Sequence, residues 1–243
     1  MAGQECSGNQ GCSDNLDGVR ASTESRRDRQ RRELVAEIIA VACRQLDEGG
    51  PGNVSWRGVA RVVGMNPASL YTYFASLDDL FTAMITESFR DLAGAVGQAF
   101  DDSEGAEPAD RLLACVRAYR AWAVANPRRF NLIWTDQLPG YAAPPGGPTV
   151  TAERAVYRPF LLAVGEAEGR GDRLAEFATL PTDDQRRLLG LFGTLHGLVS
   201  LEINSHLAPG AVDGEALIVD RMTHALRHVH LARDRSSVAS PEQ

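Results

Sequence analysis

The side chains of this sequence that could do chemistry are small or hydrogen-bonding groups gathered on one short segment. They are Asn66, Pro67, Ala68, Ser69, Tyr71, Thr72 and Tyr73. Asn66 and Ser69 can hydrogen-bond to the edges of bases in the major groove of DNA. Ala68 and the methyl group of Thr72 can contact a thymine methyl group, and the two tyrosine hydroxyls suit phosphate oxygens. The chemistry indicated is recognition of double-stranded DNA.

Two short helices must hold these side chains outward. The apolar pattern predicts one helix over residues 55–63 and a second that begins at Pro67 and ends near Phe74. Gly64 interrupts the pattern between them. Leu70 and Phe74 are four residues apart, so both can face inward, and the second helix of such a helix-turn-helix enters the major groove. The alternative is that the aromatic residues only pack a small three-helix core.

Nearly all of the remaining sequence repeats its apolar residues with a helical period, so we expect an all-α protein of about nine helices. The other helices are predicted over residues 26–48, 76–100, 112–126, 127–134, 151–168, 182–206 and 214–233. Ser76 and Asp79 resemble a capping box at the start of one of them. Residues 138–149, which hold four prolines and three glycines, are predicted to form a loop.

Charge is distributed unevenly along the chain, whose formal net charge is −7. Residues 20–61 contain nine arginines and six acidic residues, whereas the rest of the sequence contains 16 basic and 26 acidic residues. A polyanion could therefore dock at the N-terminal end. There is no run of about 18 apolar residues, and residues 1–25 lack the apolar stretch of a secretory signal. We therefore expect a cytoplasmic protein with no membrane partner.

Metal binding and catalysis are not indicated by the sequence. The four cysteines do not form the paired short spacings of a zinc site, and His224 and His228 have the spacing of a helical metal pair without a third ligand. There is no nucleophile–base signature and no phosphate-binding loop. We therefore expect no catalytic residues, no metal and no cofactor.

The segment over residues 54–80 resembles the DNA-binding region of the TetR family of regulators. The family pattern reads roughly T-x-R-x-I-A-x-x-x-G-V-S-x-G-x-L-Y-x-Y-F-x-S-K-x-x-L. The positions that match it, by identity or by a similar residue, are Ser55, Arg57, Val59, Ala60, Gly64, Met65, Leu70, Tyr71, Tyr73, Phe74, Ser76 and Leu80. The resemblance implies that Ser55 and Arg57 contact a phosphate or a base and that the two tyrosines contact the DNA backbone.

Three positions depart from the family pattern. Asn66, Ala68 and Leu77 stand where the pattern has Ser, Gly and Lys. The loss of the lysine removes a phosphate contact that the family would make. Affinity for DNA is therefore expected to depend more on the arginine-rich segment over residues 20–32.

The resemblance also implies how the chain is organised. Residues 1–25 would be a disordered tail, 26–75 the helix-turn-helix domain, 76–235 a helical effector-binding and dimerisation domain, and 236–243 a second tail. A family member of this kind would be a homodimeric repressor, released from a pseudo-palindromic operator by a small-molecule effector. The sequence leaves open whether it represses or activates. It also leaves open an all-helical ligand-binding protein, enzyme or adaptor whose helix-turn-helix does not read DNA.

By the same resemblance, the larger domain would house an effector pocket and the dimer interface. The candidate pocket residues are Trp122, Phe130, Trp134, Tyr157, Phe160, Phe192 and His196. The candidate interface residues, on the last two predicted helices, are Leu188, Leu191, Leu195, Leu198, Ile218, Met222 and Val229. For both sets the alternative is ordinary burial in the core of one chain. Phe192, His196 and Gly197 are similar to a C-terminal subfamily that has Trp in place of Phe192.

Overall fold

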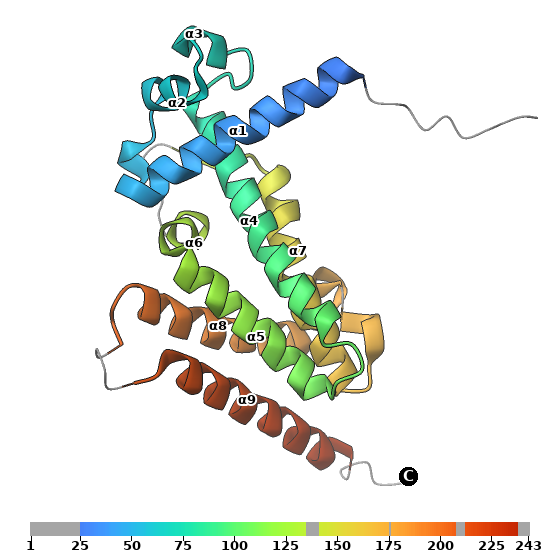
Figure 1. Ribbon diagram of the computed structural model, residues 1–243. Coiled ribbons are helices and arrows are strands. Elements are labelled where there is room, and N and C mark those ends of the chain that lie inside the picture. Colours follow the sequence, from blue (N-terminus) through green and yellow to red (C-terminus); the bar gives the residue numbers. More distant parts are fainter. Residues whose placement is uncertain (1–24, 135–140, 175, 208–211, 238–243) are drawn as a thin grey trace, which may run out of the picture.

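All regular structure in the described part of the chain is helical. The computed structural model describes residues 25–134, 141–174, 176–207 and 212–237. Within these ranges it holds nine α-helices and no strand, which confirms the predicted all-α class (Figure 1). The two predicted tails lie almost entirely outside the described residues. No described helix has both the length and the apolar character that a membrane span requires.

The N-terminal head consists of α1 (Arg26–Gly49), α2 (Trp56–Val63) and α3 (Pro67–Leu70), with the short 3-10 helix η1 (Pro51–Asn53) after α1. Their apolar faces share one buried core, made by Ile38, Val41, Ala42, Leu46, Val59, Ala60 and Leu70. The prediction that the third helix ends near Phe74 was wrong. The helix ends at Leu70, whose carbonyl accepts from the backbone N–H of both Tyr73 and Phe74, so the chain continues as a tight turn.

A long helix, α4 (Leu77–Asp102), leads from the head along the larger domain (Figure 1). It opens with a complete capping box. The backbone N–H of Asp79 donates to Ser76 Oγ at 3.1 Å, and that of Ser76 donates to Asp79 Oδ2 at 3.0 Å. Both bonds satisfy backbone donors that the first turn would leave without partners, so the start of α4 is firmly fixed. Helix α7 (Pro148–Ala167) packs along α4.

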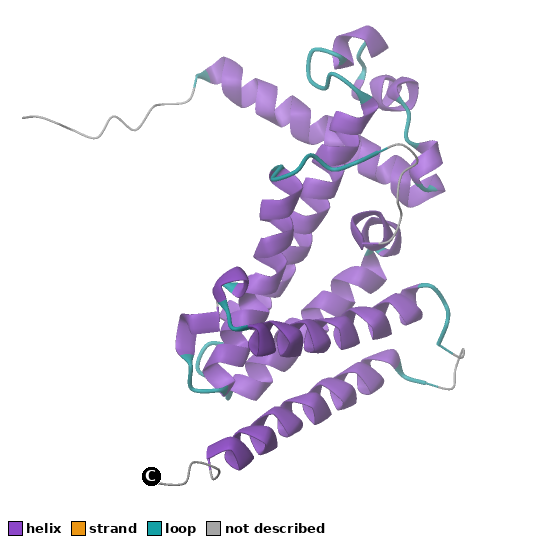
Figure 2. Ribbon diagram, turned by 180° about the vertical axis from the view of Figure 1, so that it is seen from behind, coloured by secondary structure: helices purple, strands orange, loops and turns teal. Residues whose placement is uncertain are grey.

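The remaining helices form the end of the molecule that lies away from α2 and α3. They are α5 (Pro108–Ala125), α6 (Pro127–Trp134), α8 (Thr182–Ile203) and α9 (Gly214–Ser237), with the 3-10 helices η2 (Gly171–Leu174) and η3 (Phe177–Thr179) before α8. Helices α8 and α9 lie side by side as an outer layer, in both views (Figures 1 and 2). Helix α7 begins at Pro148, three residues before its predicted start, because a proline is tolerated in the first turn.

Ion pairs made by arginine join the helices of the larger domain. The cross-helix pairs include Arg111–Glu166, Arg120–Glu202, Arg120–Glu215 and Arg187–Glu168. The Arg111 guanidinium also lies over the Phe100 ring, 3.7 Å from its centroid. These contacts tie α5 to α7, α8 and α9, and the end of α7 to α8. They hold in place the helices that surround the cavity described below.

Candidate nucleic-acid interface and ligand cavity

The nine residues predicted to read DNA lie on one part of the head surface. Eight of them are exposed, namely Ser55, Arg57, Asn66, Pro67, Ala68, Ser69, Tyr71 and Thr72, and Tyr73 is half-buried. Leu70 and Phe74 are buried, as their spacing predicted. We call the nine residues the reading face. Its polar groups point to solvent because the two apolar residues anchor the segment from below.

Two side chains of the reading face also cap its helices. Ser55 Oγ accepts from the backbone N–H of Gly58 at 3.2 Å, and Asn66 Oδ1 accepts from that of Ala68 at 2.9 Å. These oxygens therefore act as N-caps. The Ser55 hydroxyl hydrogen and the Asn66 amide NH₂ remain as donors. The side chains thus suit acceptor atoms, such as phosphate oxygens or the N7 and O6 atoms of purines.

Trp56 supports the exposed Tyr71. The two rings lie 5.4 Å apart between centroids with an interplanar angle of 50°, and Tyr71 is 55% exposed. The aromatic contact restricts the tyrosine ring while leaving it open to solvent. A fixed side chain loses less entropy on binding. Sequence reasoning did not single out Trp56, because nothing local places it beside a residue fifteen positions further on.

Arg31 of α1 holds the end of the reading face. Its Nη2 donates to the carbonyl of Thr72 at 3.1 Å, and its guanidinium lies 4.9 Å from the centroid of the Tyr73 ring. Sequence analysis placed Arg31 only within a basic segment that could attract DNA. In the structure its contacts with Thr72 and Tyr73 connect α1 to the turn after α3.

Two glycines of the head, Gly58 and Gly64, occupy positions where any other residue would clash or would strain the backbone. Gly64 ends α2 with φ of +75°, in the left-handed region that glycine adopts without strain. At Gly58, a Cβ atom would lie 2.7 Å from Nε2 of Gln45 and 2.9 Å from Oγ of Ser55. Gln45 Oε1 in turn accepts from the backbone N–H of Ser55 at 3.1 Å. The turn into α2 is therefore built tightly around the end of α1.

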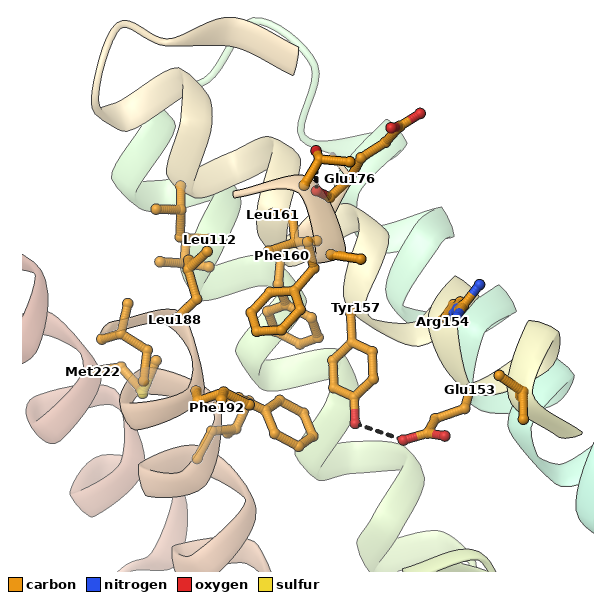
Figure 3. Close-up of a pocket in the computed structure, with 18 residues that line it drawn as sticks. Leu112, Glu153, Arg154, Tyr157, Phe160, Leu161, Glu176, Leu188, Phe192 and Met222 are labelled. Carbon is orange, nitrogen blue, oxygen red and sulfur yellow. Dashed lines mark hydrogen bonds between the residues drawn. The ribbon is translucent and has the colours of Figure 1, made fainter. Parts of the chain in front are cut away.

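A cavity of about 650 Å³ lies in the larger domain, among α5, α7, η3, α8 and α9 (Figure 3). Three of the seven predicted pocket residues line it, namely Tyr157, Phe160 and Phe192. The rest of its wall is largely aliphatic, and includes Leu112, Leu161, Leu188 and Met222. Sequence reasoning missed these aliphatic residues, which have the spacing of ordinary core positions. The volume is in the range of small-molecule sites.

The other predicted pocket residues do not line this cavity. Phe130, Trp134 and His196 form an aromatic cluster with Tyr119 behind the Phe192 wall. His196 is stacked between two phenylalanine rings, with centroids 5.2 Å from Phe130 and 5.8 Å from Phe192. Trp122 packs against the main core and is not among the residues that line the cavity.

The His196 ring is also held by a hydrogen bond. Its Nδ1 lies 3.0 Å from the hydroxyl of Tyr119. Burial lowers the pKa of His196 and raises that of Tyr119. Both groups are therefore neutral at pH 7, and the cluster is a stable, uncharged wall between the cavity and α6.

The charged groups of the cavity lie on α7 and before α8. The Tyr157 hydroxyl donates to Glu153 Oε1 at 3.0 Å (Figure 3). Burial, followed by the nearby Glu153 charge, raises the pKa of Tyr157, so the hydroxyl remains a proton donor. Arg154 and Glu176 also border the cavity, and both are exposed.

Helix α6 connects the aromatic cluster to the head. Nη1 of Arg128 donates to the carbonyls of Leu46 at 3.3 Å and Asp47 at 2.8 Å, in the last turn of α1. Arg129 pairs with Asp47 at 3.2 Å and with Asp91 of α4 at 3.4 Å. Phe130, the next residue, belongs to the aromatic cluster. One short helix thus contacts both the cavity wall and the N-terminal head.

The residues predicted for the dimer interface divide into three groups. Leu188, Leu195, Ile218 and Met222 are buried within the single chain, and the side chain of Val229 lies outside the described residues. Leu191 and Leu198 are half-buried. A different set of residues is open on α8, where Leu189 is 57% and Leu201 42% exposed. Gly190, Gly193 and Thr194 are exposed on the same helix.

The two described cysteines are not reactive. Cys43 and Cys115 are buried, and desolvation raises the pKa of the first thiol to about 11 and of the second to about 12. Both are therefore protonated at neutral pH and act as small apolar residues. Among the described residues, no three His, Cys, Asp or Glu side chains gather as a metal site.

Two parts of the sequence match family models of regulatory proteins. Residues 38–84 match the family of bacterial regulatory proteins of the tetR type, and residues 112–226 match the tetracyclin repressor-like C-terminal domain. The HTH-type transcriptional regulators Rv1816 of Mycobacterium tuberculosis and Mb1846 of Mycobacterium bovis are each 30% identical to this chain over 214 residues. These matches cover 81% of this chain and 92% of each relative.

Solved structures share the fold. The putative regulatory protein SCO4313 superposes with a TM-score of 0.66 at 27% identity, covering 83% of this chain and 98% of the other. The TetR family regulator PfmR from Thermus thermophilus has a TM-score of 0.53 at 17% identity, covering 78% and 97%. With both halves of the chain matched in sequence, and with the reading face in place, this protein belongs to the TetR family of bacterial transcriptional regulators.

Proposed function

We propose that this regulator is a homodimeric repressor that binds a pseudo-palindromic operator through its reading face and leaves it when a small molecule occupies the cavity. The observation that carries the proposal is the reading face itself. Its donors are exposed, while Trp56 and Arg31 fix its two tyrosines from neighbouring helices. Such preorganisation favours specific contacts over a merely basic surface.

A dimer would be formed by α8 and α9, the outer layer at the end away from the reading face. The open apolar residues Leu189 and Leu201, together with the small residues between them, allow close approach of a second copy. Two copies would place their reading faces about one DNA turn apart, roughly 34–36 Å. This spacing is why the operator is expected to be a pseudo-palindrome.

Release by an effector would use α6. A ligand in the cavity would contact Phe192 or Tyr157 and so displace the aromatic cluster. Because Phe130 belongs to that cluster, the displacement would also move Arg128 and Arg129 beside it. The contacts of Arg128 with the end of α1 would then favour a different head position. An effector releases DNA only to the extent that it binds the two head positions with different affinity.

The test is fluorescence anisotropy of the full chain on DNA from upstream of its own gene, over a series of salt concentrations. The proposal predicts tight binding that strengthens as salt falls, with two chains per site. Tyr71→Ala and Arg57→Ala should each lower affinity by at least about tenfold. Arg90→Ala is the matched control, because Arg90 is exposed and lies on α4, outside the reading face and the proposed dimer helices.

Two results would count against the proposal. Weak binding that neither head substitution changes, on this DNA and on sequences selected from a random pool, would exclude a DNA-reading role for the head. Binding by one chain per site would exclude the dimeric arrangement. An all-helical ligand-binding protein or adaptor would give the first result.

A further inference from the structure

Two carboxylates, Glu153 and Glu176, border the cavity, and the ion pairs of the described residues include neither of them. Glu153 is half-buried, and its Oε1 accepts from the Tyr157 hydroxyl at 3.0 Å. No cation lies within ion-pair distance of Glu153 among the described residues, and its neighbour Arg154 is exposed. Figure 3 shows the Tyr157 hydroxyl directed toward Glu153 at one side of the cavity. A partly buried charge of this kind is stabilised when an opposite charge approaches it.

The aromatic walls beside this carboxylate favour the same kind of ligand. The rings of Tyr157 and Phe192 lie 4.7 Å apart between centroids and meet edge to face, and Phe160 lines the same cavity. Aromatic faces attract cations through their negative π-electron density. The aliphatic side chains Leu112 and Leu188 complete a wall that suits hydrocarbon.

The charges that border the cavity also favour a positively charged ligand. Glu153 and Glu176 border it against the single cation Arg154. The Tyr157 hydroxyl donates to the Glu153 carboxylate. The cavity therefore presents a negative site at the edge of an apolar, aromatic space.

We propose that the cavity binds a lipophilic organic cation of drug-like size, with its positive charge near Glu153 and its hydrocarbon between Phe160 and Phe192. The inference rests on the proposed function, since it names the chemical class of the effector. A volume of about 650 Å³ accommodates one such molecule. A carboxylate or phosphate ligand would meet the unpaired Glu153 and is disfavoured.

The test uses two probes of nearly equal size and shape but opposite charge, tetraphenylphosphonium and tetraphenylborate. Isothermal titration calorimetry is carried out on the full-length protein without DNA. The proposal predicts that the phosphonium binds at least about tenfold more tightly than the borate. Equal binding of the two probes, tighter binding of the borate, or no binding of either would overturn it. This comparison uses the unaltered protein and does not depend on whether a variant folds.

Substitutions then test whether the positive charge of the probe lies beside Glu153. Glu153→Gln should weaken phosphonium binding by at least about tenfold. Arg154→Gln is the matched control, because it removes a charge at the neighbouring position, and it should leave that binding unchanged or tighten it. Tyr157→Phe keeps the aromatic wall and the carboxylate and should retain the preference for the phosphonium. A Glu153→Gln protein that folds, judged by its circular dichroism, and binds both probes as the parent does would also overturn the proposal.

The two proposals can fail separately. Phosphonium binding that leaves DNA affinity unchanged would remove the effector-release mechanism and leave the cavity assignment intact. DNA binding that another molecule releases, with no phosphonium binding, would remove the cavity assignment and leave the repressor function intact.

Discussion

The Arg31 guanidinium lies over the Tyr73 ring, 4.9 Å from its centroid, and so joins the first helix to the end of the reading face. The same side chain donates to the carbonyl of Thr72, next to that tyrosine. An arginine of the segment that was expected to attract DNA is thereby used to fix the position of residues that are proposed to contact it. The position of the turn after α3 therefore depends on these two contacts of Arg31.

Arg31→Met should therefore weaken operator binding several-fold, because the apolar stem stays and the two polar contacts are lost. The head should lose about 1 kcal/mol of stability, the sum expected for one cation–π contact and one hydrogen bond near the surface. Hydrogen exchange at the amides of residues 72–74 checks the mechanism, since exchange should become faster there. Unchanged exchange at these amides together with weaker binding would mean that Arg31 contacts DNA itself.

Gly58→Ala should lower the free energy of unfolding by about 1–2 kcal/mol, because the new methyl group displaces the Ser55 cap and the Gln45 amide. Gly94→Ala is the matched control on α4. A Cβ at Gly94 meets nothing within 4 Å, so this substitution should stabilise the protein by up to about 1 kcal/mol. Urea unfolding of both variants measures the difference. Equal effects of the two substitutions would contradict the close approach at Gly58.

Arg128→Met should reduce the coupling between ligand and DNA, because it removes the two hydrogen bonds that the Arg128 guanidinium donates to carbonyls at the end of α1. Ligand affinity of the DNA-free protein should stay within about twofold of the parent, since Arg128 does not line the cavity. The ratio of DNA affinities with and without ligand should fall toward one. Anisotropy titrations at zero and saturating ligand give this ratio. An unchanged ratio would exclude α6 as the route of release.

Protein stability should fall between pH 7 and pH 5 through His196. Burial lowers the pKa of this imidazole, so the folded protein binds fewer protons than the unfolded chain as the pH falls through the unfolded value of about 6.5. The stabilising difference is present above that value and is lost below it. His196→Gln should flatten this part of the profile. Melting temperatures of both proteins at several pH values test it, and parallel profiles would contradict it.

Leu201→Glu should convert the dimer to a monomer, because it places a charge on the open face of α8. Val124→Glu is the control, since Val124 has similar exposure but lies on α5. Light scattering after size-exclusion chromatography reads the mass directly. A dimer that tolerates Leu201→Glu would place the interface elsewhere on the surface.

Local patterns were sufficient for most of the helices and for the burial of Leu70 and Phe74 beneath the exposed residues of the reading face. The spacing of Leu70 and Phe74, the break at Gly64 and the capping box at Ser76 depend on neighbours within a few residues. The supports of the reading face are different. Arg31 and Thr72 are 41 positions apart, so only the folded arrangement brings them together.

Sequence alone could not separate the cavity from the core. Phe130 and Phe192 have the same residue type on helices of similar pattern, yet one is fully buried and the other lines the cavity. The same holds for the interface, where Leu188 turns inward and Leu189 outward. Which side of a wide apolar stripe is left open depends on how neighbouring helices pack.

The cross-helix ion pairs described above use arginine, and the sequence contains no lysine. A guanidinium keeps its charge up to a pH of at least about 12. Alkaline solution up to that pH therefore leaves the positive half of each of these ion pairs charged. Amine-directed reagents should leave these ion pairs untouched.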